Sequence, residues 1–328
     1  MPDALLDFLR LRLRTLAATP GFSERAEVGA RLTTLYDRAR TLGLVHERVP
    51  NGAGEAIAQV VFFRDPKAWF GGAVVLGWID RDPADAAAIG PVLAAIDRHR
   101  ERLGAETLIE VGVHDGPLLA GLEARGFGID SVIQVGEPRT ALAALGPNPG
   151  GGLGASLALV PLQAKHVSGV VDLHRRVFSA EPAWCWFGAY PRHLERIGRD
   201  LRADPEGHFV VLARGAGGSG EPGDEVVGHL GAELADSPYW GRVGGLELVV
   251  AAPLRGCGLA RPLYRAALAS LIARGAERMK GGTSQPGVLA LGRVMQRPWQ
   301  AFNLRRDTPF GRDHFLRFAP AEVRTAHA

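Results

Sequence analysis

The chain has 328 residues, a length that suggests two domains rather than one. With 46% hydrophobic and 22% charged residues, its composition is that of a globular protein with a full core, not of a disordered or fibrous one. The net charge of +3, without a long basic run, does not argue for nucleic-acid binding, although it favours an anionic ligand.

Cysteines and N-terminal residues bear on the compartment. Cys185 and Cys257 are too few for a disulfide framework, which fits a reducing cytoplasm. The segment DALLDFLRLRLRTL is charged throughout, unlike a signal peptide, and no apolar run reaches membrane-spanning length. The ten histidines form no spaced ligand set. We therefore expect a cytoplasmic protein without a membrane contact or a metal site.

The first half has a readable element order. Alternating apolar residues predict adjacent strands at 55–65 and 69–80. Residues 83–104 have helical spacing, and 107–114 read as a strand. Residues 116–137 predict a helix, a Gly-Phe turn and a return strand. The order is therefore strand–helix–strand–helix–strand.

Residues 146–154, GPNPGGGLG, break both helix and strand and form the best linker in the chain. They divide it into residues 1–145 and 155–328. The alternative is a long internal loop, but its position near the middle favours a domain boundary.

The second half repeats the order of the first and extends it. Strands are expected at 157–162, 207–214, 225–235, 245–250 and 277–283, with 301–306 and 314–318 as candidates for the last two. Helices are expected at 163–178, 191–201, 259–274 and 288–295. A long turn, residues 215–224, joins the second and third strands.

A glycine loop stands between the strand at 245–250 and the helix at 259–274. Small residues let a ligand approach the backbone, and the free amides and dipole of a helix N-terminus favour a phosphate. A nucleoside-triphosphate loop would need Lys and Ser/Thr after Gly258, where Leu259 stands instead. A dinucleotide fingerprint would need a third glycine at Arg261.

The same segment resembles the R/Q-x-x-G-x-G/A loop of the GCN5-related N-acetyltransferases, the GNAT superfamily, through Arg255, Gly258 and Ala260. The resemblance implies two tandem GNAT-like α/β domains, each with a mixed, mostly antiparallel sheet flanked by helices. It also implies acetyl-CoA as the acyl donor. The pyrophosphate would be held by Arg255, Gly256, Cys257, Gly258, Leu259, Ala260 and Arg261, and the pantetheine arm by the backbone of Leu248, Val249 and Val250.

The first half resembles the family more loosely. In place of the phosphate loop it has Arg81-Asp82-Pro83-Ala84-Asp85, without a glycine and with two acids that would repel a phosphate. Residues 1–145 are therefore expected to be a degenerate GNAT-like domain that does not bind acetyl-CoA. Tandem GNAT proteins with one active and one degenerate half have this layout.

Acetyl transfer to an amine needs a group that accepts the amine proton. Glu247, an acid inside an apolar strand eight residues before Arg255, is the expected base, as the resemblance implies for an acid at this offset. The alternative is a surface glutamate in a salt bridge. Glu233 and His229, on the preceding strand, are alternates on the same face.

The usual general acid of the family is a tyrosine in the helix after the fifth strand. Here Gln285 replaces the asparagine of that pattern, and Gly292 stands near the tyrosine position. Either water or Ser284 protonates the thiolate, or another tyrosine reaches the site. Tyr264 is expected to pack in the cofactor helix.

Two other features have competing interpretations. Cys257 at a helix N-terminus suggests a nucleophile, but without a visible partner it is better read as a small residue of the loop. The aromatic residues of one segment either line the acceptor pocket or pack an interface: Phe178, Trp184, Trp186, Phe187 and Tyr190.

The leading hypothesis is an acetyl-CoA-dependent N-acetyltransferase that acts on a small-molecule amine, as a monomer or homodimer. A non-catalytic acyl-CoA-binding or regulatory protein is the alternative, because the tyrosine is missing. An oxidoreductase that binds NAD through the glycine loop is a third class, which the incomplete fingerprint argues against.

Overall fold

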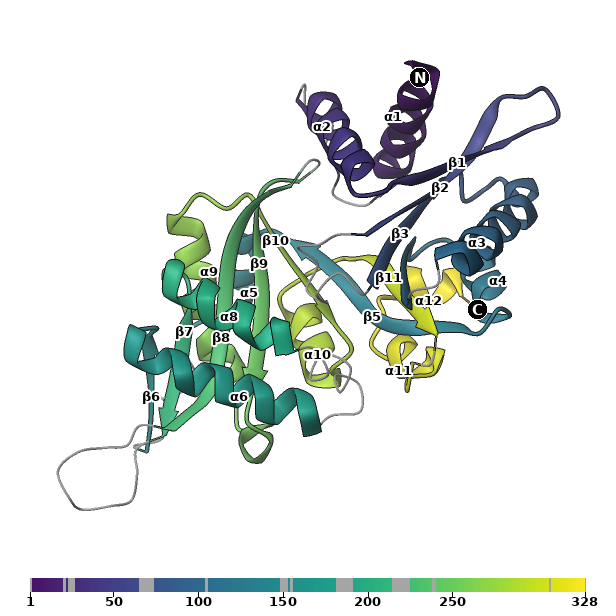
Figure 1. The fold of residues 1–328 in the computed structure, drawn as a ribbon. Coiled ribbons are helices and arrows are strands. Elements are labelled where there is room, and N and C mark those ends of the chain that lie inside the picture. The colour runs from purple at the N-terminus through teal and green to yellow at the C-terminus, as the bar shows by residue number, and fades with distance from the viewer. Residues whose placement is uncertain are drawn as a thin grey trace.

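The computed structural model describes residues 2–19, 22, 27–64, 74–103, 106–147, 153, 156–180, 191–213, 225–237, 240–306 and 308–327. Within these ranges the strands form one continuous sheet of eleven strands, in the order β1-β2-β3-β4-β11-β5-β10-β9-β8-β7-β6. Both ends of the chain lie on the side of the first half (Figure 1). The two halves of the sequence therefore share a single sheet.

The first half begins with two helices, α1 (Pro2–Ala17) and α2 (Val28–Thr41), where no element was expected. The expected strand–helix–strand–helix–strand order follows them. The remaining elements are β1 (Val45–Pro50), β2 (Ala56–Arg64), β3 (Val74–Arg81), η1 (Ala86–Ala88), α3 (Ile89–Leu103), β4 (Glu106–Gly112), α4 (Gly116–Glu123), β5 (Phe127–Gly136) and α5 (Pro138–Leu145).

The second half follows the expected order as far as its last strand. Its elements are β6 (Leu157–Pro161), η2 (Ala164–His166), α6 (Val167–Ala180), α8 (Pro191–Ala203), β7 (Phe209–Ala213), β8 (Glu225–Ser237), β9 (Gly241–Val250), η3 (Ala252–Leu254), α9 (Ala260–Ala273), β10 (Arg278–Thr283), α10 (Pro286–Val294), β11 (Trp299–Arg306), α11 (Arg312–Leu316) and α12 (Ala321–Ala326).

The expected strand at 314–318 is wrong, because α11 occupies most of it. Phe315 is fully buried in the first-half core, and the acidic Asp313 lies in the first turn, where it favours a helix. Five residues are too few for apolar spacing to separate a strand from a helical turn. The expected turn at 215–224 lies outside the described residues.

The two halves exchange their last strands. β5, which ends the sheet-forming part of the first half, pairs with β10 of the second half. β11, the last strand of the second half, pairs with β4 of the first half and with β5. Most pairs are antiparallel, and β3–β4 and β9–β10 are parallel. Figure 1 shows β5 crossing between the two halves.

In the second half, helices cover both faces of the sheet. α6 and α8 pack on one face, where Val249 of β9 joins their apolar core. α9 and α5 cover the opposite face, against Leu246, Leu248 and Val250. In Figure 1, α6 and α8 lie in front of β7–β9 and α9 lies behind. No helix of the described residues is long and apolar enough to cross a membrane.

Candidate active site

The glycine loop follows β9 and η3 and ends where α9 begins at Ala260. Gly256 and Gly258 have φ angles of 77° and 81°, a conformation that L side chains rarely adopt. Open space surrounds both positions, since no heavy atom lies within 4 Å of where a Cβ would stand. The loop thus presents uncovered backbone at the N-terminus of a fourteen-residue helix, as an anion site requires.

A cavity of about 1000 Å³ opens beside this loop. The structure brings all but one of the expected cofactor-binding residues to its wall: Leu248, Val249, Val250, Arg255, Gly256, Gly258, Leu259, Ala260 and Arg261. Cys257 does not line it; the side chain is exposed, with Sγ 3.9 Å from the backbone oxygen of Arg255. The cavity has room for a ligand much larger than a simple anion.

β9 and β10 separate along the cavity. Their parallel pairing covers only Val243, Gly244 and Gly245 of β9. From Leu246 to Val250 the other edge of β9 is still paired with β8, while these residues line the cavity. Among the described residues no strand covers this edge of β9 beyond Gly245. An extended ligand arm can therefore pair with its backbone.

Glu247 points to the face covered by α6 and α8, as the alternation along β9 predicts. Its side chain is 24% exposed, and the exposed part faces the cavity. Burial raises the pKa of this carboxyl to about 8, and the negative charge of Glu233 adds to the increase, whereas Arg196 opposes it. At neutral pH the carboxyl is thus mostly protonated, and it becomes a carboxylate as the pH rises through about 8.

Behind Glu247 runs a chain of three buried histidines. Nδ1 of His174 on α6 lies 4.0 Å from Oε1 of Glu247. Nε2 of His174 lies 3.0 Å from Nδ1 of His229, whose Nε2 lies 3.2 Å from Nδ1 of His208. The rings of His229 and His208 lie in parallel planes, which suits an N–H···N hydrogen bond. The sequence gives little sign of this chain, because His174 lies on α6, His229 lies on β8 and His208 lies in the loop before β7.

His208 and His229 are neutral near pH 7. Burial lowers the pKa of His208 to about 4, although the negative charge of Asp204 opposes the shift. Burial also lowers the pKa of His229 well below 6.5, and its two histidine neighbours add to this effect. A neutral imidazole donates with one nitrogen and accepts with the other, so His229 can donate a hydrogen bond to one of its two histidine neighbours and accept one from the other.

The expected acid, Ser284, lies apart from this arrangement. It is 2% exposed and is not among the cavity-lining residues, and its backbone oxygen accepts a hydrogen bond from His314 (2.7 Å). Gly292, near the family's tyrosine position, faces the side chain of Gln134, which would lie 2.3 Å from an added Cβ. A tyrosine at 292 would therefore require the end of the Gln134 side chain to move.

Two further polar residues line the cavity: Tyr264, which was expected to pack in the cofactor helix, and Arg297, which the sequence did not mark. Tyr264 is buried in the α9 core, and burial raises the pKa of its hydroxyl, while the neighbouring Arg297 opposes the increase. Of the expected aromatic wall, Phe178 lines the cavity and packs edge-on against His174. Trp184, Trp186, Phe187, Tyr190 and Cys185 lie outside the described residues.

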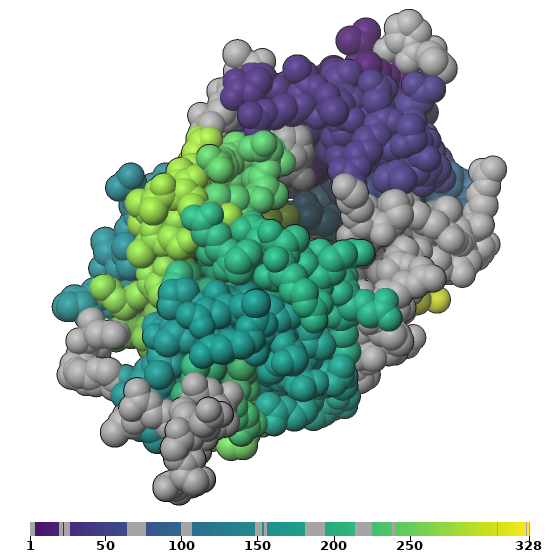
Figure 2. All heavy atoms as spheres, turned by 60° about the vertical axis from the view of Figure 1, so that its left-hand side comes forward, coloured from purple at the N-terminus to yellow at the C-terminus, as the bar shows by residue number. Residues whose placement is uncertain are grey.

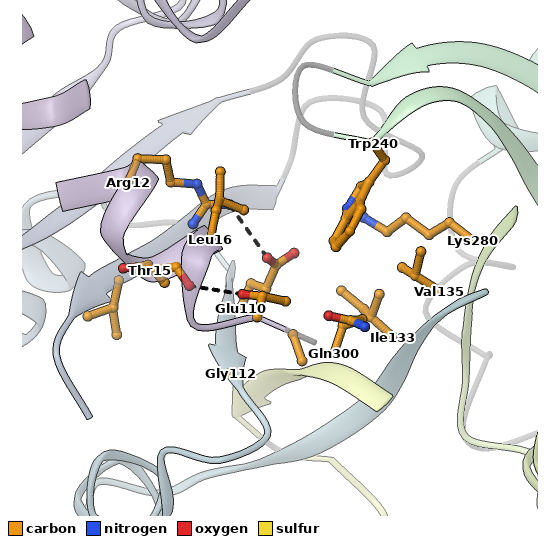
Figure 3. A pocket seen from close by; sticks show the side chains of 13 residues that line it. Arg12, Thr15, Leu16, Glu110, Gly112, Ile133, Val135, Trp240, Lys280 and Gln300 are labelled. Carbon is orange, nitrogen blue, oxygen red and sulfur yellow. Dashed lines mark hydrogen bonds and ion pairs between the residues drawn. The ribbon is translucent and has the colours of Figure 1, made fainter. Parts of the chain in front are cut away.

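A smaller cavity of about 60 Å³ adjoins the first half. Trp240 and Lys280 line both cavities, while Arg12, Glu110 and Gln300 line only the smaller one. Figure 3 shows Arg12 and Glu110 on one side of it, with Trp240 and Lys280 across from them. The surface is hollowed where the N-terminal helices meet the second half (Figure 2).

The equivalent turn of the first half is closed by its own side chains. Arg81 is buried and forms a two-pronged ion pair with Asp115, with 2.7 Å between Nε and Oδ2. Asp85 accepts a hydrogen bond from the amide of Ala87, and Asp82 accepts one from Ala84. The carboxylates thus occupy the amides that a phosphate would need. β3 and β4 also stay paired over a longer stretch than β9 and β10, from Val74 to Trp78 of β3.

Comparisons with known proteins agree with this geometry. Residues 175–290 match the acetyltransferase (GNAT) family. A GCN5-related N-acetyltransferase from Sphaerobacter thermophilus is similar over 95% of this chain and 95% of its own, with a TM-score of 0.58 and 14% identity. A glucosamine N-acetyltransferase region of a fungal multi-domain GH3 beta-N-acetylglucosaminidase is similar over 90% of this chain and 36% of that chain, with a TM-score of 0.51 and 15% identity.

A tandem GNAT protein from the clavulanic acid biosynthesis pathway is similar over 93% of this chain and 94% of that chain, with a TM-score of 0.48 and 16% identity. No curated protein matches the sequence. The two solved structures with TM-scores above 0.5 show a common fold. The family match covers the glycine loop, Glu247, and the strands β9 and β10 that separate along the cavity. Residues 175–290 therefore form an acetyltransferase domain of the GNAT family, and the chain that carries this domain is an acyltransferase.

Proposed function

We propose that the chain transfers an acetyl group from acetyl-CoA to the amine of a small-molecule acceptor, with Glu247 as the base. One observation carries the proposal: a carboxyl with its pKa raised to about 8 stands in the wall of the cavity that starts at the glycine loop. A base is most effective when its pKa lies near the working pH.

The loop and the open edge of β9 suit the two ends of acetyl-CoA. The amides from Gly256 to Arg261 would hold the pyrophosphate, because the glycines leave space and the helix N-terminus attracts negative charge. The backbone of Leu248 to Val250 would pair with the pantetheine arm. The thioester would then lie toward the point where β9 and β10 meet.

In the transfer, the amine nitrogen attacks the thioester carbonyl and loses a proton to the Glu247 carboxylate. The new N–C bond forms, the C–S bond breaks, and its electron pair goes to sulfur. The proton on Glu247 then passes through water to the thiolate as coenzyme A leaves, which restores the carboxylate. Atoms and charges balance over the cycle.

Residues 1–145 would help to form the binding site for the acceptor and would not bind acetyl-CoA themselves. Leu108, Asp130 and Ser131 of the first half line the large cavity. Arg31 on α2 donates a hydrogen bond to the backbone oxygen of Ser237 (2.9 Å), beside the cavity wall. The first half would therefore help to select the acceptor, while Asp82 and Asp85 keep phosphates out of its own turn.

A second candidate function is that of an acyl-CoA-binding protein that does not catalyse acetyl transfer. Gly292 favours it, because the tyrosine usual in the family is missing there and the side chain of Gln134 occupies the adjacent space. Release of free coenzyme A thiol in the presence of an amine separates the two candidates.

The proposal is tested by calorimetric titration with acetyl-CoA of the wild type, Gly258→Asp and Gly258→Asn. Asn and Asp have nearly the same shape, and both tolerate positive φ better than other side chains, so the pair isolates charge. We expect Gly258→Asp to bind at least about tenfold more weakly than Gly258→Asn, a difference of ~1.4 kcal/mol. No binding by the wild type contradicts both candidates.

Thiol release is then followed with a panel of amines. Acetyl-CoA binding with release that depends on the amine supports the transferase. Binding without release for any amine favours the second candidate.

A further inference from the structure

Arg297 is a buried cation surrounded by neutral groups. The residue is 4% exposed, and burial lowers the pKa of its guanidinium. Nη2 donates a hydrogen bond to the backbone oxygen of Gln134 (3.0 Å) and lies 3.5 Å from that of Gly281. The Tyr264 hydroxyl lies near it and opposes the lowering of its pKa. Among the described residues no carboxylate lies within ion-pair distance of this guanidinium.

Such an arrangement is costly unless an anion joins it. Taking a charge out of water costs several kcal/mol even after the protein relaxes around it, and an opposite charge normally offsets this. Arginine does not escape by losing its proton, because guanidinium is charged at any pH at which proteins fold. The cost therefore points to an anion that is present only part of the time.

The guanidinium lies where β9 and β10 separate. A Cβ on Gly281 of β10 would stand 2.8 Å from Nη2 of Arg297 and 3.5 Å from the backbone oxygen of Leu246 on β9. Leu246 is the first residue of β9 beyond the paired part of the two strands. Arg297 also lines the large cavity, so the charge stands at its inner end.

Glu247 and Arg297 belong to opposite faces of the sheet. Glu247 faces α6 and α8, whereas Tyr264, the partner of Arg297, belongs to the α9 face. A thioester placed between them would have the base on its acceptor side and a cation on the other side. The side chain of Gln134 fills the place from which a tyrosine of α10 would act.

We propose that Arg297 binds the coenzyme A thiolate as it leaves the tetrahedral intermediate, in place of a tyrosine that would protonate it. The inference rests on the proposed function. The electron pair of the broken C–S bond stays on sulfur as a thiolate, held by the guanidinium and the Tyr264 hydroxyl. Its proton arrives afterwards from Glu247 through water. Gly281 has no side chain, so sulfur can approach the guanidinium.

The test is a titration of the thiol of bound coenzyme A, without any turnover. Thiolate absorbs in the ultraviolet more strongly than thiol, and the protein loaded with desulfo-coenzyme A serves as the blank for Cys185 and Cys257. We expect the thiol of bound coenzyme A to titrate about one pH unit or more below that of the free compound, because an adjacent cation favours the anion.

Two variants locate the effect. In Arg297→Gln the midpoint returns to that of free coenzyme A, while in Arg297→Lys, which keeps the charge, part of the shift remains. Arg293→Gln is the matched control, since this exposed arginine lies four residues earlier, on α10. In Arg293→Gln, the thiol of bound coenzyme A should titrate with the same midpoint as in the wild type.

The outcomes separate the two proposals. If the wild type binds coenzyme A but its thiol titrates as in solution, the role of Arg297 is overturned while the transferase stands. The same holds if Arg297→Gln binds coenzyme A with the wild-type midpoint. If calorimetry finds no coenzyme A binding to the wild type, the transferase fails and the role of Arg297 fails with it. The wild-type measurement decides even if Arg297→Gln does not fold.

Discussion

Glu247 and His174 approach each other across the space between β9 and α6, with 4.0 Å between Oε1 and Nδ1. This distance is too long for a direct hydrogen bond, and a bridging water or a small swing of the carboxylate would close it. Through His174 the candidate base adjoins His229 and His208, and the charged groups that shift its pKa are Glu233 and Arg196. The first predictions concern these groups.

Glu247→Gln removes the base and should lower kcat/KM by roughly 10²–10⁴-fold, the usual contribution of general-base catalysis. The wild type should gain activity as the pH rises through about 8, because only the carboxylate accepts a proton. The plot of kcat/KM against pH for Glu247→Gln should lack this rising limb. An acceptor amine that is already neutral at pH 6 is the control, since its own titration cannot produce the limb. A limb that survives in Glu247→Gln contradicts the assignment.

The midpoint of that limb should follow the neighbouring charges in opposite directions. Glu233→Gln removes a negative charge that raises the pKa of Glu247, so the midpoint falls. Arg196→Gln removes a positive charge that lowers it, so the midpoint rises. Each shift should be about half a unit to one unit, as expected for a partly screened charge. Measured kcat/KM against pH shows whether the two variants diverge; movement in the same direction refutes the electrostatic origin.

Acid should destabilise the protein through the histidine chain. His208 has an ordinary pKa of 6.5 but a folded-state pKa of about 4, so between these values the unfolded chain binds more protons. The free energy of unfolding should therefore fall as the pH drops from 6.5 to about 4, by roughly 3 kcal/mol for this residue. His229 contributes with the same sign.

Urea denaturation across this pH range checks the histidine prediction. His208→Gln should flatten the dependence, whereas the control His114→Gln, at an exposed histidine, should leave it. Equal slopes for the wild type and His208→Gln would show that this ring is not held neutral.

Asp115→Asn should destabilise the fold without affecting the donor site. The change leaves the Arg81 guanidinium buried without its carboxylate, which costs about 3–5 kcal/mol. Asp82→Asn is the control, because Asp82 pairs with Arg14 at the surface and such pairs contribute little. Chemical denaturation should separate the two variants, and calorimetry should find the same acetyl-CoA affinity in both. Loss of donor binding in Asp115→Asn would argue for a ligand in the first half.

The sequence predicts the elements of the second half well, because apolar spacing and the glycine loop are local signals. α1 and α2 were missed although their apolar spacing is helical, and the strand expected at 314–318 was too short to distinguish from a helical turn. Strand exchange leaves no trace in the sequence. Alternation along 299–306 shows that one face is buried but not whether β4 or β10 is the neighbour.

For the site, the residues of the loop and Glu247 could be named from the sequence, because they stand at fixed offsets within one strand–loop–helix unit. His174, His208 and Arg297 could not, since one lies on α6 and the other two in separate loops, and only the packed fold brings them to the site. A lone arginine or histidine carries no signal of its burial, and burial is what gives these residues their chemistry.

The exchange of β5 and β11 has a consequence for synthesis of the chain. β4 ends at Gly112, yet its neighbour β11 begins only at Trp299, so during translation the edge of β4 waits until nearly the whole polypeptide has left the ribosome. An uncovered edge strand promotes aggregation, so the exposed edge of β4 is a segment that a chaperone would bind during synthesis. A premature stop before residue 299 would leave the donor loop intact and yet disable the half of the molecule made first.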